Sequence, residues 1–471
     1  MTDETPQVNF EDISRSDLDS HNDYSYADKW EKGLSESLIR QVSGEKDEPD
    51  WILDIRLKAF ATYQKLAMPS WGPDLSDLHL DEIRYFAAAD QEANQKSWDD
   101  VDPKIKATFE RLKIPEAERA MLAGVGAQYD SEMVYHNLKE EWVEKGVIFL
   151  DFDVAIKEHP ELVKKYFTNC IPINDHKFAA LHYAIFSGGT FLYVPEGVEI
   201  TQPLQAYFRM NAKNGGQFEH TLIIVAPGAK AQYIEGCSAP KFGSNSLHAG
   251  GVEVFVGAGA EARYSSVENW SQDTYNLNTK RALVKDNAKM EWVGGNLGSG
   301  TTMLYPCSIL IGDNARCDHL GVAFANANQN QDTGAKITIV GKNCRATVVS
   351  KSLSKGGGIS TYRGVIDIKP TADNAVINVE CDALMLDGFS VSDTIPHIVC
   401  SNESASITHE ASAGKISEEV ILYFASRGIG EEEAKGIIVN GFLDEIVKTL
   451  PMEYAGELNR LIELEMEGSI G

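Results

Sequence analysis

Three residues in the C-terminal third carry side chains that bind metals or move protons: Cys381, His409 and Glu410. A thiolate and a carboxylate held together suit a soft-to-borderline metal such as iron or zinc. Adjacent residues of a strand point to opposite faces, so His409 and Glu410 share a site only if a bulge or bend lies at Thr408 to His409. Each of them therefore needs partners from elsewhere in the chain.

The seven cysteines stand at positions 170, 237, 307, 317, 344, 381 and 400, with no Cys-x-x-Cys pair. This scatter fits neither a disulfide framework nor a zinc ribbon, and it indicates thiols in a reducing compartment. For any single cysteine the default role is that of a small buried hydrophobe, and the positions of Cys317 and Cys344 favour such packing.

The overall composition predicts a cytoplasmic protein whose partners are proteins or cations. The N-terminus lacks the basic-then-apolar pattern of a secretory signal, and no apolar run reaches the roughly 18 residues of a membrane span. The formal net charge is −27, whereas a nucleic-acid surface needs clustered Lys and Arg. We therefore expect neither a membrane nor a nucleic-acid partner.

A repeat of regular length runs through the strand-rich part of the chain. A small residue follows a turn at Ala229, Ala260, Ala288, Ala315, Cys344, Ala375 and Ala405, and the spacing between successive positions is nearly constant. A parallel β-helix requires this pattern, because every coil turns its corner at the same place. Helical repeats lack the β-branched runs found here, and a propeller blade needs about 40 or more residues.

The repeat region and the segments before and after it divide the chain into four parts. Residues 1–50 contain 14 acidic and 5 basic residues, so we expect a solvated, flexible segment. Helical spacing predicts a helical N-terminal domain over 51–177 and a helical C-terminal domain over 412–471, with the β-helix core at 178–411. The C-terminal helices have two interpretations: they cap the end of the solenoid, or they dock a partner.

The repeat converts sequence separation into distance. Cys381 and Glu410 are 29 residues apart, one repeat, which predicts adjacent coils about 4.8 Å apart. Cys237 precedes Cys381 by 144 residues, so these two thiols lie about five coils, or roughly 24 Å, apart. The chain has no Gly-x-x-x-x-Gly-Lys-Ser/Thr motif and hence no P-loop of its own.

Ten ordered segments carry a resemblance that extends from about Pro49 to the C-terminus. They are YFRMN (207–211), QFEHTLIIV (217–225), YIEGCSAP (233–240), ENW (268–270), NTKRAL (278–283), DTGAKI (332–337), YRG (362–364), CDALMLDG (381–388), THEASAGKISEE (408–419) and RGIGEEEAKGIIVNGF (427–442). These segments resemble the SufB/SufD family of iron-sulfur cluster assembly scaffolds, and within it the SufB branch.

The resemblance implies a non-enzymatic scaffold: a right-handed parallel β-helix whose helical C-terminal domain docks the SufC-type ABC ATPase. The implied cargo is iron and a transient [2Fe-2S] or [4Fe-4S] cluster. The implied partners are a SufD-like subunit or a second copy of the chain, a cysteine desulfurase or other sulfur donor, and apoprotein acceptors.

The resemblance also assigns roles to single residues. Cys237 in EGCSAP matches the cysteine that receives persulfide sulfur, and Cys381 with Glu410 matches the pair on which the cluster is built. His409 matches a histidine beside that pair and is a further candidate ligand. The residues implied to line the sulfur route inside the β-helix are Arg209, Asn211, Glu268, Trp270 and Lys280.

Two positions depart from the family pattern. Glu268 stands where glutamine is usual, and Thr408 replaces the first acid of a Glu-His-Glu pattern. Two alternatives compete with a SufB-type scaffold: a SufD-like structural subunit, and a polysaccharide hydrolase or lyase, which needs paired carboxylates in an outer groove. The placement of Cys237, Cys381 and Glu410 favours the SufB interpretation over both.

Overall fold

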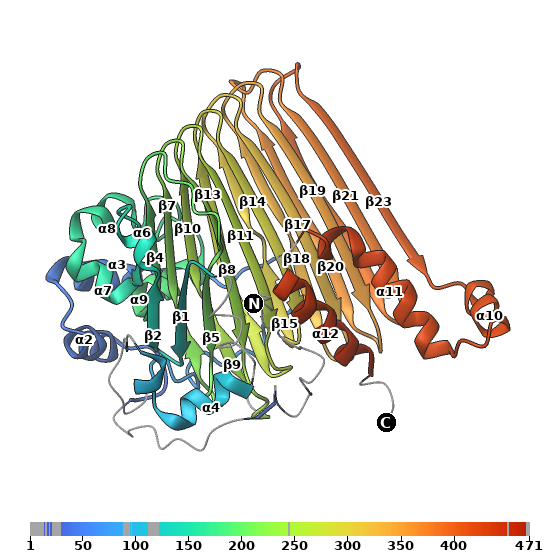
Figure 1. Ribbon diagram of the computed structural model, residues 1–471, viewed down its shortest axis with the longest axis horizontal. Coiled ribbons are helices and arrows are strands. Elements are labelled where there is room, and N and C mark those ends of the chain that lie inside the picture. The colour runs from blue at the N-terminus through green and yellow to red at the C-terminus, as the bar shows by residue number, and fades with distance from the viewer. Residues whose placement is uncertain are drawn as a thin grey trace, which may run out of the picture.

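The protein is a solenoid of two long sheets with helices at one end and along one flank (Figure 1). The computed structural model describes residues 30–87, 97–111, 122–243, 245–449 and 452–467, together with 14, 17, 19, 20 and 95. Half of the acidic segment 1–50, which we predict to be flexible, lies outside these residues. In its other half, Glu36–Glu45 form a helix that buries Leu38, Ile39 and Val42, so the prediction of flexibility is wrong there. The predicted parallel β-helix is confirmed.

In the part of the chain that the structure describes, the first sheet contains ten strands. In spatial order they are β2 (Glu132–Leu138), β1 (Gly124–Tyr129), β5 (Leu204–Arg209), β8 (Lys230–Ser238), β11 (Glu261–Asn269), β14 (Lys289–Leu297), β17 (Arg316–Ala325), β19 (Arg345–Ser354), β21 (Val376–Met385) and β23 (Ser406–Lys415). Strands β1 and β2 are antiparallel, and the pairs from β5 to β23 are parallel.

The second sheet lies opposite the first. It runs through β3 (Ile148–Asp151), β4 (Gly189–Val194), β7 (His220–Val225), β10 (Gly251–Val256), β13 (Thr279–Val284), β16 (Cys307–Leu310), β18 (Asn330–Ile339), β15 (Thr301–Leu304), β12 (Thr274–Asn276), β9 (Ser246–His248) and β6 (Gly216–Gln217). From β18 it also continues to β20 (Ile359–Ile368) and β22 (Val391–Cys400).

The corners of the coils confirm the sequence repeat. The residues with φ between 55° and 67° just before the predicted small residues are Gly228, Gly259, Asn287, Asn314, Asn343 and Asn374. This left-handed conformation favours glycine and asparagine. The small residue that follows is at most 1% exposed at each of these six corners, so the corners stack in register. Cys344 takes the place of alanine at one of them.

The N-terminal region is helical only in part. Its helices are α2 (Glu36–Glu45), α3 (Asp50–Lys65), η2 (Trp98–Asp100), α4 (Pro103–Arg111), α6 (Glu140–Val143), α7 (Phe152–Glu158), α8 (Pro160–Tyr166) and α9 (Lys177–Ile185). Helix α8 begins at Pro160, with proline in its first turn, where a missing backbone N–H costs little. The prediction of a helical domain over 51–177 is wrong at Val134 and Leu138, because these residues form β2, whose backbone pairs with β1.

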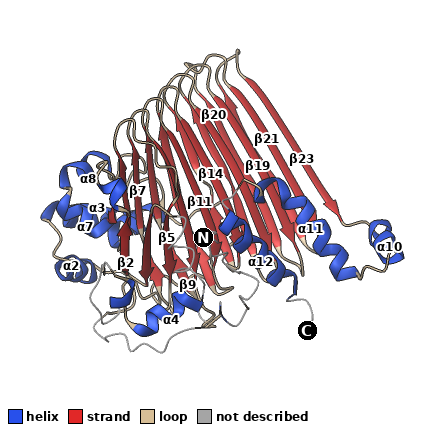
Figure 2. Ribbon diagram, viewed as in Figure 1, coloured by secondary structure: helices blue, strands red, loops and turns tan. Residues whose placement is uncertain are grey.

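The C-terminal helices are α10 (Glu418–Ser426), α11 (Glu431–Val447) and α12 (Met452–Glu467). Helices α11 and α12 bury apolar side chains such as Val439 and Leu458 against outward residues of the first sheet, including Val293. Helix α10 buries no residue and projects beyond β23 (Figure 2). These helices cover a flank rather than the end of the solenoid, so the capping interpretation is wrong and β22 and β23 stay largely exposed.

No helix in the described ranges is both long enough and apolar enough to cross a membrane.

Candidate functional site

Cys237 lies inside the solenoid, on β8. Its side chain is 1% exposed, and it pairs across the ladder with Phe208 on β5 and Glu268 on β11. Because side chains alternate along a strand, Glu235 points to the same inner face. Its Oε1 lies 3.8 Å from the Cys237 sulfur. The thiol is therefore in the core with carboxyl groups around it.

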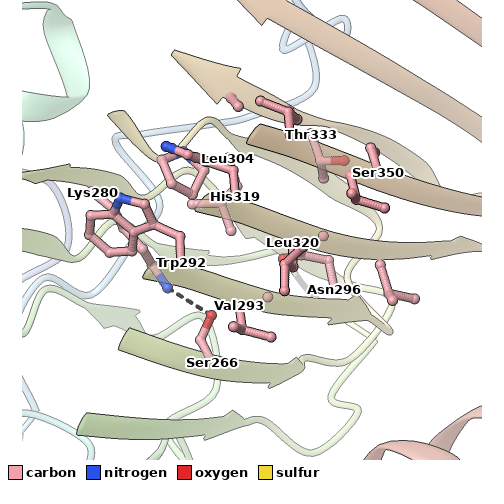
Figure 3. A pocket seen from close by; sticks show the side chains of 18 of the residues that line it. Ser266, Lys280, Trp292, Val293, Asn296, Leu304, His319, Leu320, Thr333 and Ser350 are labelled. Atoms are coloured by element: carbon pink, nitrogen blue, oxygen red, sulfur yellow. Dashed lines mark hydrogen bonds between the residues drawn. The ribbon is translucent and has the colours of Figure 1, made fainter. Parts of the chain in front are cut away.

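A buried ammonium group joins these carboxyl groups. Lys280, on β13, places Nζ 2.6 Å from Glu268 Oε1 and 3.5 Å from Glu235 Oε1. The same Nζ donates a hydrogen bond to Ser266 Oγ at 3.2 Å (Figure 3). The three charged side chains are each about 1% exposed. Because an unpaired buried charge is costly, Lys280 and the two carboxyl groups stay buried only as partners of one another.

A hydrogen-bonded chain extends the cluster across the interior. Asn276 donates from Nδ2 to Glu268 Oε2 at 2.5 Å, and its Oδ1 lies 2.9 Å from His248 Nδ1. The other ring nitrogen of His248 lies 2.5 Å from Glu219 Oε1. The Trp270 ring lies over His248 at 4.2 Å between centroids. Glu268, Trp270 and Lys280 thus all belong to the surroundings of Cys237.

Burial and charge set the protonation of this cluster. Burial raises the pKa of Cys237 well above its ordinary value, and Glu235 and Glu268 add to that rise while Lys280 opposes it. Burial also raises the pKa of Glu235. At Glu268 burial acts the same way, but Lys280 and His248 outweigh it and lower the pKa. The thiol is therefore protonated at neutral pH beside a carboxyl group whose affinity for a proton is increased.

Arg209 and Asn211, the other two residues predicted to line the sulfur route, lie outside the surroundings of Cys237 described above. Arg209 pairs with Ser238 and donates from a guanidinium nitrogen to the Ser238 hydroxyl at 3.0 Å. Because Phe208 shares the inner face with Cys237, the pleat turns Arg209 to the outer face. The backbone N–H of Asn211 bonds to Asp130 Oδ1 at 2.5 Å. The prediction that Arg209 faces the interior is therefore wrong.

Cys381 lies five strands from β8 along the first sheet, as the repeat predicts. Its side chain is 3% exposed, faces the interior and pairs with Ala411 on β23. His409, two residues before Ala411, points to the same face. The His409 Nε2 lies 3.7 Å from the Cys381 sulfur. The thiol and the imidazole thus meet on adjacent coils.

Glu410 lies on the outer face, where it pairs with Glu380. The predicted adjacency of the coils of Cys381 and Glu410 is confirmed, but these two side chains point to opposite faces. Cys381 pairs with Ala411 rather than with Glu410, so this coil is one residue longer than the repeat predicts, and a one-residue offset reverses the face. The pairing of these strands continues without a bulge, so the bulge expected for His409 is not needed.

Tyr362 on β20 completes the surroundings of Cys381. Burial raises the pKa of the Cys381 thiol to about 12, and a hydrogen bond with Tyr362 opposes that shift. At neutral pH this thiol is protonated too, so binding a metal there displaces a proton.

A cavity of about 50 Å³ lies inside the solenoid, and Figure 3 shows side chains that line it. The coils that line it stand between the strands of Cys237 and Cys381 in the first sheet. Lys280 and Ser266 line it toward Cys237, and Ser350 and Tyr362 line it toward Cys381. A cavity of this size holds a few water-sized molecules. Its lining therefore includes residues from the surroundings of both thiols.

Sequence reasoning missed four residues of these two regions: Glu219, Glu235, His248 and Tyr362. The alternation of side chains along a strand could have identified Glu235, because it stands two residues before Cys237 in a predicted strand and must share its face. The other three come from the second sheet or the turns beside it. Their meeting with Cys237 and Cys381 depends on how the two sheets face each other.

Comparison with known proteins agrees with this architecture. Residues 208–442 match the family described as "SUF system FeS cluster assembly, SufBD core domain", and residues 40–206 match "SufBD protein N-terminal region". An iron-sulfur cluster assembly SufBD family protein of Staphylococcus aureus (strain MRSA252) is 51% identical over 96% of this chain and 97% of its own. One of Staphylococcus haemolyticus (strain JCSC1435) is 52% identical over 94% and 95%. The chain belongs to the SufBD family of SUF-system iron-sulfur cluster assembly proteins.

Proposed function

We propose that this chain is a SufB-type scaffold that accepts persulfide sulfur at Cys237, moves it through the solenoid and builds a nascent iron-sulfur cluster at Cys381. The observation that carries the proposal is the shared interior: both thiols face it, and a cavity of about 50 Å³ lies between them. The alternative is a SufD-like structural subunit, which needs neither thiol.

Direct contact does not connect the two thiols. Five inter-strand steps separate β8 from β21, which amounts to about 24 Å. Sulfur taken up at Cys237 therefore has to travel along the axis. The buried cluster of Lys280, Glu235 and Glu268 supplies polar groups at the start of that path.

Iron arrives at Cys381, for which His409 is the ligand that the geometry brings closest. Glu410 stays a proposed ligand on the strength of the family resemblance, although its side chain is on the outer face. Within the described residues, no three His, Cys, Asp or Glu side chains form a metal-binding group. The remaining ligands then come from the nascent cluster's sulfide, from solvent or from a second chain.

The open end of the solenoid is where we place that second chain, either a SufD-like subunit or another copy. The last strand of the second sheet, β22, exposes Val391, Ile395, Ile398 and Val399, each by about 40%. An exposed edge with apolar side chains pairs readily with another strand. Such pairing would cover the coil next to Cys381 and His409.

We assign the SufC-type ATPase to α10. This helix projects from the body, and its Leu422 and Tyr423 are 68% and 59% exposed. ATP hydrolysis then belongs to the partner, and this chain acts as a scaffold rather than an enzyme. A cysteine desulfurase or other donor supplies sulfur, apoproteins receive the cluster, and seven free cysteines fit a cytoplasmic site of action.

Anaerobic reconstitution tests the division of labour between the thiols. Cys237→Ser is expected to lose assembly from persulfide yet keep a cluster when iron and free sulfide are supplied, because the iron site is intact. Cys381→Ser is expected to lose both, since a thiolate is the soft ligand of that site. Absorption and Mössbauer spectra identify the cluster as [2Fe-2S] or [4Fe-4S]. Equal behaviour of both variants with free sulfide would contradict the proposal.

A further inference from the structure

One row of the first sheet connects the neighbourhood of Cys237 with Cys381. Its members pair in register from strand to strand: Glu235, Ser266, Gly294, Gly321, Ser350 and Cys381. Side chains in register on successive coils point to the same side of the sheet, here the interior. The row thus runs along the axis from the carboxyl group beside the first thiol to the second thiol.

The rows of this face differ in the size of their side chains. The adjacent row, two residues earlier on each strand, contains bulky side chains over most of its length: Tyr233, Tyr264, Trp292, His319, Val348, Val379 and His409. Between Glu235 and Cys381, the first row holds two serines and two glycines. A row of small residues beside bulky ones leaves a groove inside the core, and the cavity lies along it.

Gly294 and Gly321 are not explained by backbone conformation or by close packing. Neither has a positive φ. A Cβ added at Gly321 would meet no atom within 4 Å, and one at Gly294 would meet only the Ser266 hydroxyl, at 3.8 Å. The next residue, Gly295, is different, because its Cβ would lie 2.9 Å from Leu458 of α12. Glycine within a strand costs stability relative to alanine, so the two inner glycines keep space open at that cost.

We propose that Gly294 and Gly321 form the narrow section of the sulfur passage. This inference rests on the proposed transfer from Cys237 to Cys381. Among the described residues, those that line the cavity carry no thiol to relay the sulfur. The volume of about 50 Å³ accommodates only small species.

Hydrosulfide acts as the carrier: it attacks the outer sulfur of the Cys237 persulfide, which leaves the Cys237 thiol and a hydrodisulfide ion. The Cys381 thiolate then attacks the hydrodisulfide, which forms the Cys381 persulfide and releases hydrosulfide, so no oxidant is needed. Hydrodisulfide is of the size of the cavity, whereas glutathione persulfide and persulfidated peptides are not.

Substitutions of graded size at Gly321 test this passage in the full chain. The wild type, Gly321→Ala and Gly321→Val are loaded anaerobically with a cysteine desulfurase and cysteine. Alkylation and peptide mass spectrometry then measure sulfur on Cys237 and on Cys381 separately. We expect normal loading of Cys237 in all three proteins, reduced delivery to Cys381 with alanine, and loss of delivery with valine. Assembly from free sulfide and iron should persist, because the end of the solenoid at Cys381 is open.

Gly414→Val is the matched control, since Gly414 is a strand glycine outside this row whose Cβ would also meet no atom within 4 Å. Wild-type delivery to Cys381 in a folded Gly321→Val protein would overturn the inference. If valine prevents folding, unchanged delivery in Gly321→Ala would overturn it as well. Absence of sulfur on Cys237 in the wild type would instead contradict the proposed function and is distinct from either result.

Discussion

The Nε2 of His409 lies 3.7 Å from the sulfur of Cys381, on the next coil of the solenoid and on the same inner face. Glu410, the next residue, pairs with Glu380 on the outer face. The relationship identifies the imidazole as the nearest protein ligand for a metal held by this thiol. Glu410 instead lies beside Glu380, which already forms an ion pair with Lys351 at 3.1 Å.

Replacing His409 and replacing Glu410 should therefore have unequal effects on the retention of iron. We expect His409→Ala to release iron from the reconstituted protein faster than Glu410→Ala does, because only the imidazole faces Cys381. Iron retention after gel filtration, measured by atomic emission, compares the two variants. Greater loss from Glu410→Ala would show that β23 turns or shifts when the cluster forms.

The buried ammonium of Lys280 should matter strongly for stability. Lys280→Met leaves Glu235 and Glu268 without their cation, and breaking a buried ion pair in this way costs about 3–5 kcal/mol. Lys289→Met is the control: its side chain is 37% exposed beside Glu291 and Asp318, and exposed pairs contribute about 0–1 kcal/mol. Urea denaturation measures both variants. Similar losses would mean that water or a shifted proton already compensates the buried carboxyl groups.

His248 should make stability depend on pH. Burial lowers its pKa, but Glu219 and the hydrogen bonds outweigh burial, so the folded-state pKa is raised above 6.5. A raised pKa stabilises the fold fully below about pH 6.5, and this contribution is lost as the pH rises through the folded value. We expect the urea midpoint to fall on going from pH 6.5 to pH 9, and to fall less in His248→Gln. An equal fall in both proteins would assign the effect to other groups.

The exposed helix α10 should be separable from the fold. Leu422→Asp with Tyr423→Ser is expected to abolish binding of the ATPase and to leave the circular dichroism spectrum and melting temperature unchanged, since α10 buries no residue. Deletion from Ser417 onward removes α11 and α12 as well and uncovers the apolar flank, so it should lower the melting temperature and cause aggregation. Binding that survives the double substitution would move the interface away from α10.

The sequence was sufficient to predict the solenoid, because six of its seven predicted corners have a glycine or asparagine followed by a small residue. It was not sufficient to assign faces. The length of the repeat varies slightly from coil to coil, as the corner positions show, and an error of one residue moves a side chain to the other face. Glu410 was misplaced in this way, because the coil that joins Cys381 to its partner Ala411 is one residue longer than the repeat that was assumed.

The buried cluster around Cys237 illustrates a second limit. Lys280 and His248 come from the second sheet, whereas Glu235, Cys237 and Glu268 come from the first, so their meeting depends on how the sheets face each other across the core. No sequence period relates positions on opposite walls. The family resemblance did identify Glu268, Trp270 and Lys280 as a group, but it also included Arg209, whose strand pleat points it outward.

Transfer of sulfur from Cys237 to Cys381 is tested by following labelled sulfur to Cys381. The protein is incubated anaerobically, without iron, with a cysteine desulfurase and ³⁴S-labelled cysteine, and the Cys381 peptide is examined by mass spectrometry after alkylation. We expect label on both Cys237 and Cys381 in the wild type, and none on Cys381 in Cys237→Ser. Wild-type labelling of Cys381 in Cys237→Ser would contradict transfer through the solenoid and would show that sulfur enters at the open end.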